Sequence, residues 1–193
     1  TLDRSSAASD VYKRQDMDFT SKNDITENEY FEMIKNKTAV LIGCSFMFGG
    51  IASETNTSNT DLLYKIGLNL GIAFQLEDDL LDCFGDQEKF GKRIGGDILE
   101  KKKTLLYLFT HSKLESEKKL EFENIFNSNE IEESQKINSI KSFYETSGAL
   151  EYLKNKVRVY FNEAEMLIDK LESDKDTKKK LNLFCKTLLN REI

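Results

Sequence analysis

The chain of 193 residues has 28 Lys and Arg against 34 Asp and Glu, a formal net charge of −6, and 39% hydrophobic residues. This balance is typical of a soluble globular domain with one sizeable core, and it excludes a disordered or collagen-like chain. The acidic surface argues against nucleic-acid binding, which needs a basic footprint. No run of about 18 apolar residues predicts a transmembrane helix.

The opening residues, 1–15, lack the apolar core of a signal peptide, and their SSAASDVYKRQ stretch looks like translated adapter sequence. We interpret residues 1–15 as a non-native leader and residues 16–193 as the C-terminal part of a single domain that begins upstream. The cysteines Cys44, Cys83 and Cys185 have no spacing of a disulfide framework or a zinc site. A reducing, cytoplasmic location is therefore favoured.

A first helix is predicted from residue 26 to about Ala52. The TENE sequence of residues 26–29 has the pattern of a capping box, in which Thr26 and Glu29 each bond to the other's backbone N–H. The glycines at 49 and 50 loosen the end of this helix, and the polar loop SETNTSN follows.

The next helix should begin after a polar cap and end near Cys83, at the Gly85–Asp86 turn. The candidate caps are Ser58, Asn59 and Thr60. Its apolar residues occupy nearly every side, which is typical of a helix inside a core.

The rest of the chain shows apolar residues every three or four positions, the period of amphipathic helices. We expect helices at about 104–111, 115–126, 130–146, 150–171 and 175–190, with Asn129 and Asp174 as caps and Gly148 at a joint. No strand pattern of useful length is present, so the predicted fold class is all-α.

The second helix carries an acidic stripe, defined as Gln75, Asp78, Asp79 and Asp82. The spacing i, i+3, i+4, i+7 puts all four on one side of a helix. Charges on a buried helix are poorly solvated, so a cation should face the stripe. One reading is a wet helix face neutralised by Lys and Arg from elsewhere. The other is a magnesium site, because hard oxygen ligands with open positions suit that ion.

The residues that follow favour the magnesium reading. A loop with four glycines carries Lys92 and Arg93, and Lys101, Lys102 and Lys103 come next. Glycine lets the backbone pass close to a ligand, and lysine supplies point charges to phosphate. Carboxylates followed by glycine-spaced lysines are the combination that a diphosphate–magnesium cluster requires.

Lys37 and Thr38 interrupt an apolar run in the first helix. Lys37 is either a lysine that extends its ammonium group to water at the rim of the bundle or a contact to the same diphosphate, which we favour. Gly67 and Gly71, one turn apart, permit either close helix packing or room for an apolar tail. His111 is interpreted as a surface histidine. The aromatic residues Phe46, Phe48, Phe74, Phe84 and Tyr107 are interpreted as core, although some could line an isoprenoid channel.

The sequence FQLEDDLLDCFGDQEKFGKRIGGDILEKKKTLL of residues 74–106 resembles the second aspartate-rich signature of the trans-isoprenyl diphosphate synthases. Residues 29–50, EYFEMIKNKTAVLIGCSFMFGG, resemble the helix of that family with a Lys-Thr pair, and DMDF at 16–19 resembles the segment before it. The resemblance covers nearly everything after Gln15.

The resemblance implies a bundle of long helices around a central cavity, here incomplete, in an enzyme that acts as a homodimer. It implies that magnesium is bound by Asp78, Asp79 and Asp82. It implies that the allylic diphosphate is contacted by Lys37, Gln75, Lys92 and Lys102, and that Thr38, which lies beside it, belongs to the same diphosphate-binding set. Asp78, Asp79, Lys37 and Lys92 are the residues expected to carry catalysis. Arg191 resembles a C-terminal basic position over the site.

The implied reaction joins isopentenyl diphosphate to an allylic diphosphate. The allylic C–O bond ionises, the isopentenyl double bond attacks the carbocation, and the departing diphosphate takes the proton that is lost.

Two departures from the family pattern stand out. The first aspartate-rich motif is absent, which fits a truncated chain with an exposed apolar surface, and Lys101 occupies a position that is Gly in many members. If the complete protein also lacks the first aspartate-rich motif, the chain is a non-catalytic subunit of a heteromeric synthase. A related terpene cyclase is the third reading.

Overall fold

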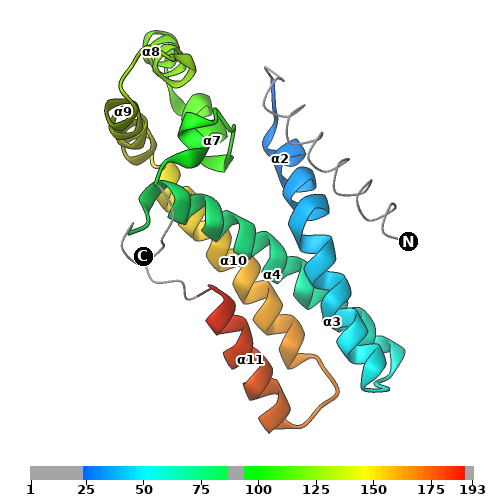
Figure 1. Cartoon of the computed structure of the whole chain (residues 1–193). Coiled ribbons are helices and arrows are strands. Elements are labelled where there is room, and N and C mark those ends of the chain that lie inside the picture. Colours follow the sequence, from blue (N-terminus) through cyan, green and yellow to red (C-terminus); the bar gives the residue numbers. More distant parts are fainter. Residues whose placement is uncertain (1–23, 87–93, 190–193) are drawn as a thin grey trace, which may run out of the picture. The chain divides into compact units, whose positions relative to one another are not determined.

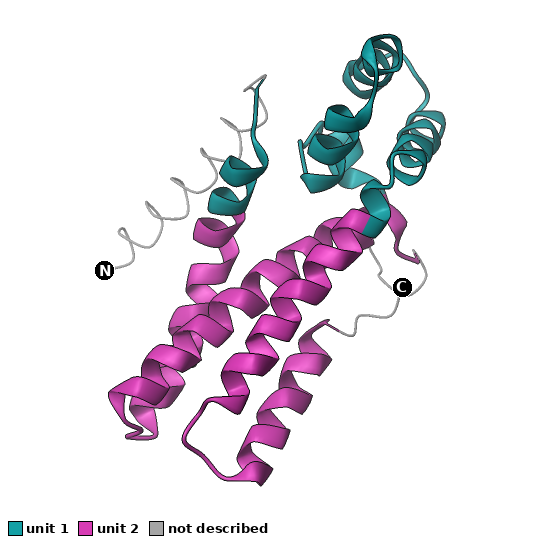
Figure 2. Ribbon diagram, turned by 180° about the vertical axis from the view of Figure 1, so that it is seen from behind, with its two compact units in different colours: residues 1–33, 95–151 teal, residues 34–94, 152–193 magenta. Residues whose placement is uncertain are grey.

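The structure is a computed structural model that describes residues 24–86 and 94–189, and within these ranges it contains helices and no strand (Figure 1). The all-α prediction is therefore confirmed. The chain forms two compact units (Figure 2). Unit 1 comprises Thr1–Met33 and Gly95–Glu151, and unit 2 comprises Ile34–Ile94 and Tyr152–Ile193.

The first helical run consists of α2 (Glu27–Ile34), the π-helical turn η1 (Lys35–Ala39) and α3 (Val40–Ala52). The predicted capping box is confirmed: the Glu29 amide donates to Thr26 Oγ1 (3.2 Å), and the Thr26 amide donates to Glu29 Oε2 (2.9 Å). In η1 the Val40 amide donates to the Lys35 carbonyl, five residues back. This wider turn inserts one extra residue into an otherwise regular helix.

The long helix α4 (Thr57–Phe84) ends at Gly85, as predicted, but it begins earlier than the sequence indicated. Its cap is Asn56, whose Oδ1 accepts from the Asn59 amide at 2.8 Å, so the predicted caps were wrong. Asn59 is instead buried inside the first turn. Its side chain donates to the Glu172 carbonyl (3.1 Å) and accepts from the Glu172 amide (2.9 Å). These bonds connect the start of α4 to the turn between α10 (Ala149–Asp169) and α11 (Lys175–Leu189).

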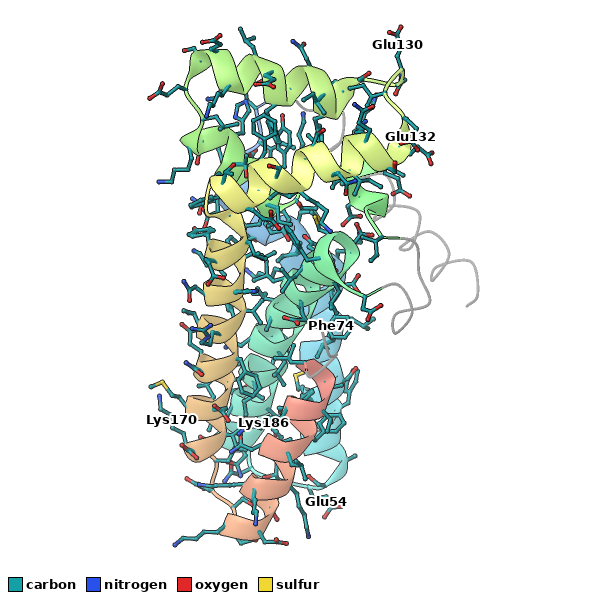
Figure 3. All side chains as sticks on the ribbon, turned by 90° about the vertical axis from the view of Figure 1, so that its left-hand side faces the viewer. Glu54, Phe74, Glu130, Glu132, Lys170 and Lys186 are labelled. Carbon is teal, nitrogen blue, oxygen red and sulfur yellow. The ribbon has the colours of Figure 1, made fainter. Side chains whose placement is uncertain are left out.

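Unit 2 is built around α4, with α3, α10 (Ala149–Asp169, from Tyr152 in this unit) and α11 (Lys175–Leu189) beside it (Figure 1). Its core joins α4, α10 and α11 through the buried residues Ile66, Leu70, Ala164, Ile168, Leu171 and Cys185. Lys186, labelled in Figure 3, pairs with Glu165 of α10 at 3.2 Å. The predicted cap Asp174 is confirmed, since its Oδ1 accepts from two amides at the start of α11.

A close backbone contact in unit 2 lies between α4 and the first helical run. A Cβ on Gly71 would stand 2.4 Å from the Cα of Ala39, and a Cβ on Gly67 would stand 2.7 Å from the Cα of Gly43. The backbone of the first helical run therefore leaves no space for a side chain at positions 67 and 71. Of the two roles left open for these glycines, close helix packing is the one that the structure supports.

Unit 1 contains the first part of α2, α6 (Gly96–Leu99), α7 (Leu105–Lys113), α8 (Ser116–Asn127) and α9 (Glu133–Thr146). The predicted α7, α8 and α9 are confirmed, whereas α6 was not foreseen. The cap of α9 is Glu132, whose side chain accepts from the Gln135 amide, so Asn129 was the wrong choice. The buried aromatic residues of this unit are Tyr30, Tyr107, Phe122, Phe126 and Tyr144.

One face of α3 exposes large apolar side chains in the described structure: Leu41 (71% exposed), Phe48 (62%) and Ile51 (55%). Phe48 is therefore not a core residue here, contrary to the prediction. The expected exposed apolar surface is present. None of the described helices combines the length and the apolar character that a membrane span needs.

The glycine contact makes a first prediction about stability. Gly71→Ala should lower the free energy of unfolding by about 1–3 kcal/mol, because the new methyl group forces α4 and η1 apart. Urea unfolding followed by circular dichroism measures the change.

The matched control is Gly49→Ala in α3, where a Cβ meets nothing within 4 Å. This variant should be unchanged or stabilised by up to about 1 kcal/mol, because alanine is the better helix former. If the two variants unfold at the same urea concentration, the close contact does not exist.

Candidate functional site

The structure brings the Lys37-Thr38 pair, which lies in the π turn η1, and the acidic stripe together inside unit 2. Thr38 Oγ1 in η1 donates to Gln75 Oε1 of α4 at 2.8 Å. Gln75 Nε2 then donates to Asp79 Oδ1 at 3.0 Å. A continuous line of hydrogen bonds thus runs from the π turn to one carboxylate of the stripe.

The three aspartates of the stripe differ in burial. Asp79 is 6% exposed, whereas Asp78 and Asp82 are half-buried. A buried carboxylate requires hydrogen-bond donors, and the Gln75 amide is one of them. The half-buried pair, Asp78 and Asp82, is one helical turn apart and more accessible to a ligand.

These carboxylates fit magnesium as a partial ligand set. Magnesium takes one or two carboxylates and completes its shell with water and phosphate oxygens. Within the described ranges no three or more His, Cys, Asp or Glu residues converge on one point that could hold a metal ion. Asp78, Asp79 and Asp82 remain the predicted ligands, and a diphosphate would have to supply further oxygens.

Lys37 lies in η1, next to Thr38, and its side chain is exposed. An exposed lysine on this turn is accessible to an anion. Its position on the π turn was not foreseen, because neither proline nor glycine marks that turn. The only signal was the polar Lys-Thr pair within an apolar run, which is consistent with the frequent use of π turns at functional sites.

Lys102 belongs to unit 1. Its Nζ pairs with Asp97 Oδ1 (2.8 Å) and Glu100 Oε2 (2.7 Å). Burial alone would lower the pKa of Lys102, but the hydrogen bonds to Asp97 and Glu100 outweigh burial and raise that pKa above its ordinary value. Lys102 is therefore a cation at neutral pH, and a diphosphate would compete with these two carboxylates for it.

Several predicted residues lie outside the described ranges: Lys92, Arg93, Arg191 and the DMDF segment of residues 16–19. Their roles stay predictions.

Lys101, the departure from the family's glycine, has a left-handed backbone with φ of 56°. Glycine adopts this region without steric cost, whereas other residues do so at a cost of about 1–2 kcal/mol. The side chain compensates by donating to the Asn127 carbonyl and to Asn129 Oδ1, each at 2.7 Å. The structure therefore explains both the usual glycine and how a lysine is accommodated.

His111 is half-buried in unit 1 rather than fully at the surface. Its Nε2 forms a hydrogen bond with Glu123 Oε1, and its ring stacks on Tyr107. Burial, with the nearby Glu123 carboxylate, raises the pKa of Tyr107 to about 12. The group joins α7 to α8.

A family model described as polyprenyl synthetase matches residues 5–145. The geranylgeranyl diphosphate synthase of Sulfolobus acidocaldarius is 34% identical over 164 residues, which are 83% of this chain and 48% of that protein. A crystal structure of a geranylgeranyl pyrophosphate synthase is 36% identical with a TM-score of 0.87, and the match covers 100% of this chain and 60% of that one.

A third relative was solved with ligands. It is a polyprenyl synthase from Caulobacter crescentus complexed with calcium and isoprenyl diphosphate, 26% identical with a TM-score of 0.85, matched over 100% of this chain and 58% of its own. The chain spans about half the length of several curated relatives and about 60% of these solved structures.

The Lys101 backbone leads to a prediction that two variants test together. Lys101→Met loses both side-chain hydrogen bonds and keeps the strained backbone, so it should lower the free energy of unfolding by about 1 kcal/mol. Lys101→Gly loses the same bonds but relieves the strain, and should be more stable than Lys101→Met by about 1 kcal/mol. Thermal and urea unfolding measure both. Equal stability of the two variants would show that residue 101 is not left-handed.

Proposed function

Since the chain belongs to the polyprenyl synthetase family, we propose that it is the C-terminal part of a magnesium-dependent trans-prenyltransferase. The proposed reaction lengthens an allylic diphosphate by one isopentenyl unit. We also propose that the complete protein is cytoplasmic and forms a homodimer. The observation that carries the proposal is the Thr38–Gln75–Asp79 line of hydrogen bonds, which joins the Lys-Thr turn to the acidic stripe in one unit.

Different residues of unit 2 would bind the allylic diphosphate in different ways. Asp78 and Asp82, with Asp79 behind them, would hold magnesium, which when bound neutralises charge on the leaving diphosphate. Lys37, exposed on η1, would neutralise further oxygens of the same group. The family resemblance also assigns Lys92 and Lys102 to the diphosphate, and these two roles stay predictions.

No side-chain base is needed in this reaction. Once the allylic C–O bond has broken, the electrons of the isopentenyl double bond form the new C–C bond. The departing diphosphate then takes the proton from the adjacent carbon. What the chain must supply is positive charge around the diphosphate and an apolar surface that keeps water from the carbocation. The helix α3, which has no charged residue from Val40 to Ala52, would supply part of this surface.

The experiment uses the product of the complete gene, because the chain spans only about half the length of several curated relatives. With magnesium, isopentenyl diphosphate and dimethylallyl diphosphate, we expect a longer isoprenyl diphosphate in the mass spectrum. Asp78→Asn should lower kcat/KM by about 10²- to 10³-fold, the size expected for loss of one electrostatic contact to the transition state.

The control is Asp61→Asn, an exposed aspartate near the start of the same helix, which should leave kcat/KM unchanged. The proposal fails if no elongated product forms in the presence of magnesium. It also fails if Asp78→Asn and Asp61→Asn behave alike.

A further inference from the structure

We propose that Thr38 is a positioning residue, which acts through the Gln75 side-chain amide on the Asp79 carboxylate and does not itself bind the diphosphate. This inference rests on the proposed function and assigns Thr38 a different role from the one that the family resemblance implies. It follows from the direction of the two hydrogen bonds that join η1 to α4.

The Asp79 carboxylate determines which atom is the donor in each of the two hydrogen bonds. An ionised carboxylate only accepts hydrogen bonds, so the Gln75 atom that faces it must be the donor Nε2. The opposite amide orientation would place the carbonyl oxygen Oε1 against the carboxylate and repel it. The carboxylate therefore determines which way the Gln75 amide points.

The Gln75 amide then determines where the Thr38 hydroxyl points. With Nε2 used toward Asp79, the atom that faces Thr38 is the acceptor Oε1, so Thr38 Oγ1 must donate to it, at 2.8 Å. A hydroxyl group has one proton. While it is engaged with Gln75, Thr38 has only lone pairs to offer, and these repel the oxygens of a diphosphate.

Gln75 keeps one further donor. The Nε2 group has two N–H bonds, and one is used toward Asp79. The second can reach another acceptor without disturbing the line of hydrogen bonds. Gln75 can thus hold Asp79 and contact a ligand at once, whereas Thr38 cannot both hold Gln75 and donate elsewhere.

Helix packing holds Thr38 in place. Ala39, the next residue, is fully buried. Its Cα packs so closely on α4 that a Cβ added to Gly71 would lie only 2.4 Å from it. Gly71 is one helical turn before Gln75, and Gln75 is one turn before Asp79. The contact and both hydrogen bonds therefore follow one side of α4.

The test is a double-mutant cycle on the product of the complete gene. The probe is inorganic pyrophosphate with magnesium, measured by titration calorimetry. Thr38→Val keeps the shape of the side chain and removes the hydroxyl, so the Kd should rise by about 3- to 10-fold, the range for loss of one hydrogen bond. Thr38→Ser restores the hydroxyl and should bind within about twofold of the parent protein.

The decisive variant is Gln75→Met, which has no amide to relay the effect. In this background Thr38→Val should change the Kd by less than about twofold, because Thr38 then has nothing to act through. The matched control is Ser45→Ala. Ser45 is exposed, lies two turns further along the same helical run, and donates its hydroxyl to the Leu41 backbone carbonyl. This variant should leave the Kd unchanged.

A second measurement needs no ligand. The Gln75 side-chain amide can be assigned in the NMR spectrum of the metal-free protein by its loss in Gln75→Met. Its resonances should shift in Thr38→Val and stay in place in Ser45→Ala.

The outcomes separate the two proposals. If the parent protein does not bind magnesium pyrophosphate, the proposed function fails, and this inference falls with it. If the parent binds, the inference alone is overturned by a full Thr38→Val effect in the Gln75→Met background, since Thr38 would then touch the ligand directly. Unshifted Gln75 amide resonances in Thr38→Val would also overturn it.

Discussion

The site of this protein depends on one steric constraint, the contact between the backbone of α4 and the π turn η1. At Gly71 no side chain larger than hydrogen fits, because the Cα of Ala39 occupies the space. This approach brings Thr38 within 2.8 Å of Gln75, and Gln75 extends the line to Asp79. A wider separation of the two helices would leave the hydroxyl and the amide too far apart to bond. The glycine pair, which has no chemistry of its own, thus determines which polar groups meet.

The sequence predicted the acidic stripe well because helical spacing is a local property. Four residues at i, i+3, i+4 and i+7 share a side of any α-helix, and α4 is one continuous helix from Thr57 to Phe84. The capping box at Thr26 was predictable for the same reason. What the sequence could not indicate was the partner of each polar group. Asn59 has the residue type of a helix cap, yet its side chain bonds to Glu172, more than a hundred positions away.

Backbone irregularities were the other gap. The π turn at Lys35–Ala39 contains no proline or glycine, so no residue type marked it, although the polar Lys-Thr pair lay within it. Lys101 was predicted only as a departure from the glycine that the family resemblance leads one to expect. Its left-handed backbone, with φ of 56°, is a conformation that favours glycine, and the sequence analysis drew no conclusion about it.

Placing the aspartates on one helix has a consequence for the order of events in the proposed function. Three side chains at positions 78, 79 and 82 of a single helix do not by themselves enclose an ion, and within the described residues no group of three or more such ligands converges. Magnesium would then take its remaining ligands from water and from diphosphate oxygens. Magnesium and the diphosphate would then each strengthen the binding of the other, and by linkage the two effects are equal in size. For this part of the proposed synthase, a bound diphosphate would therefore strengthen the hold of these aspartates on magnesium, and magnesium would strengthen the binding of the diphosphate.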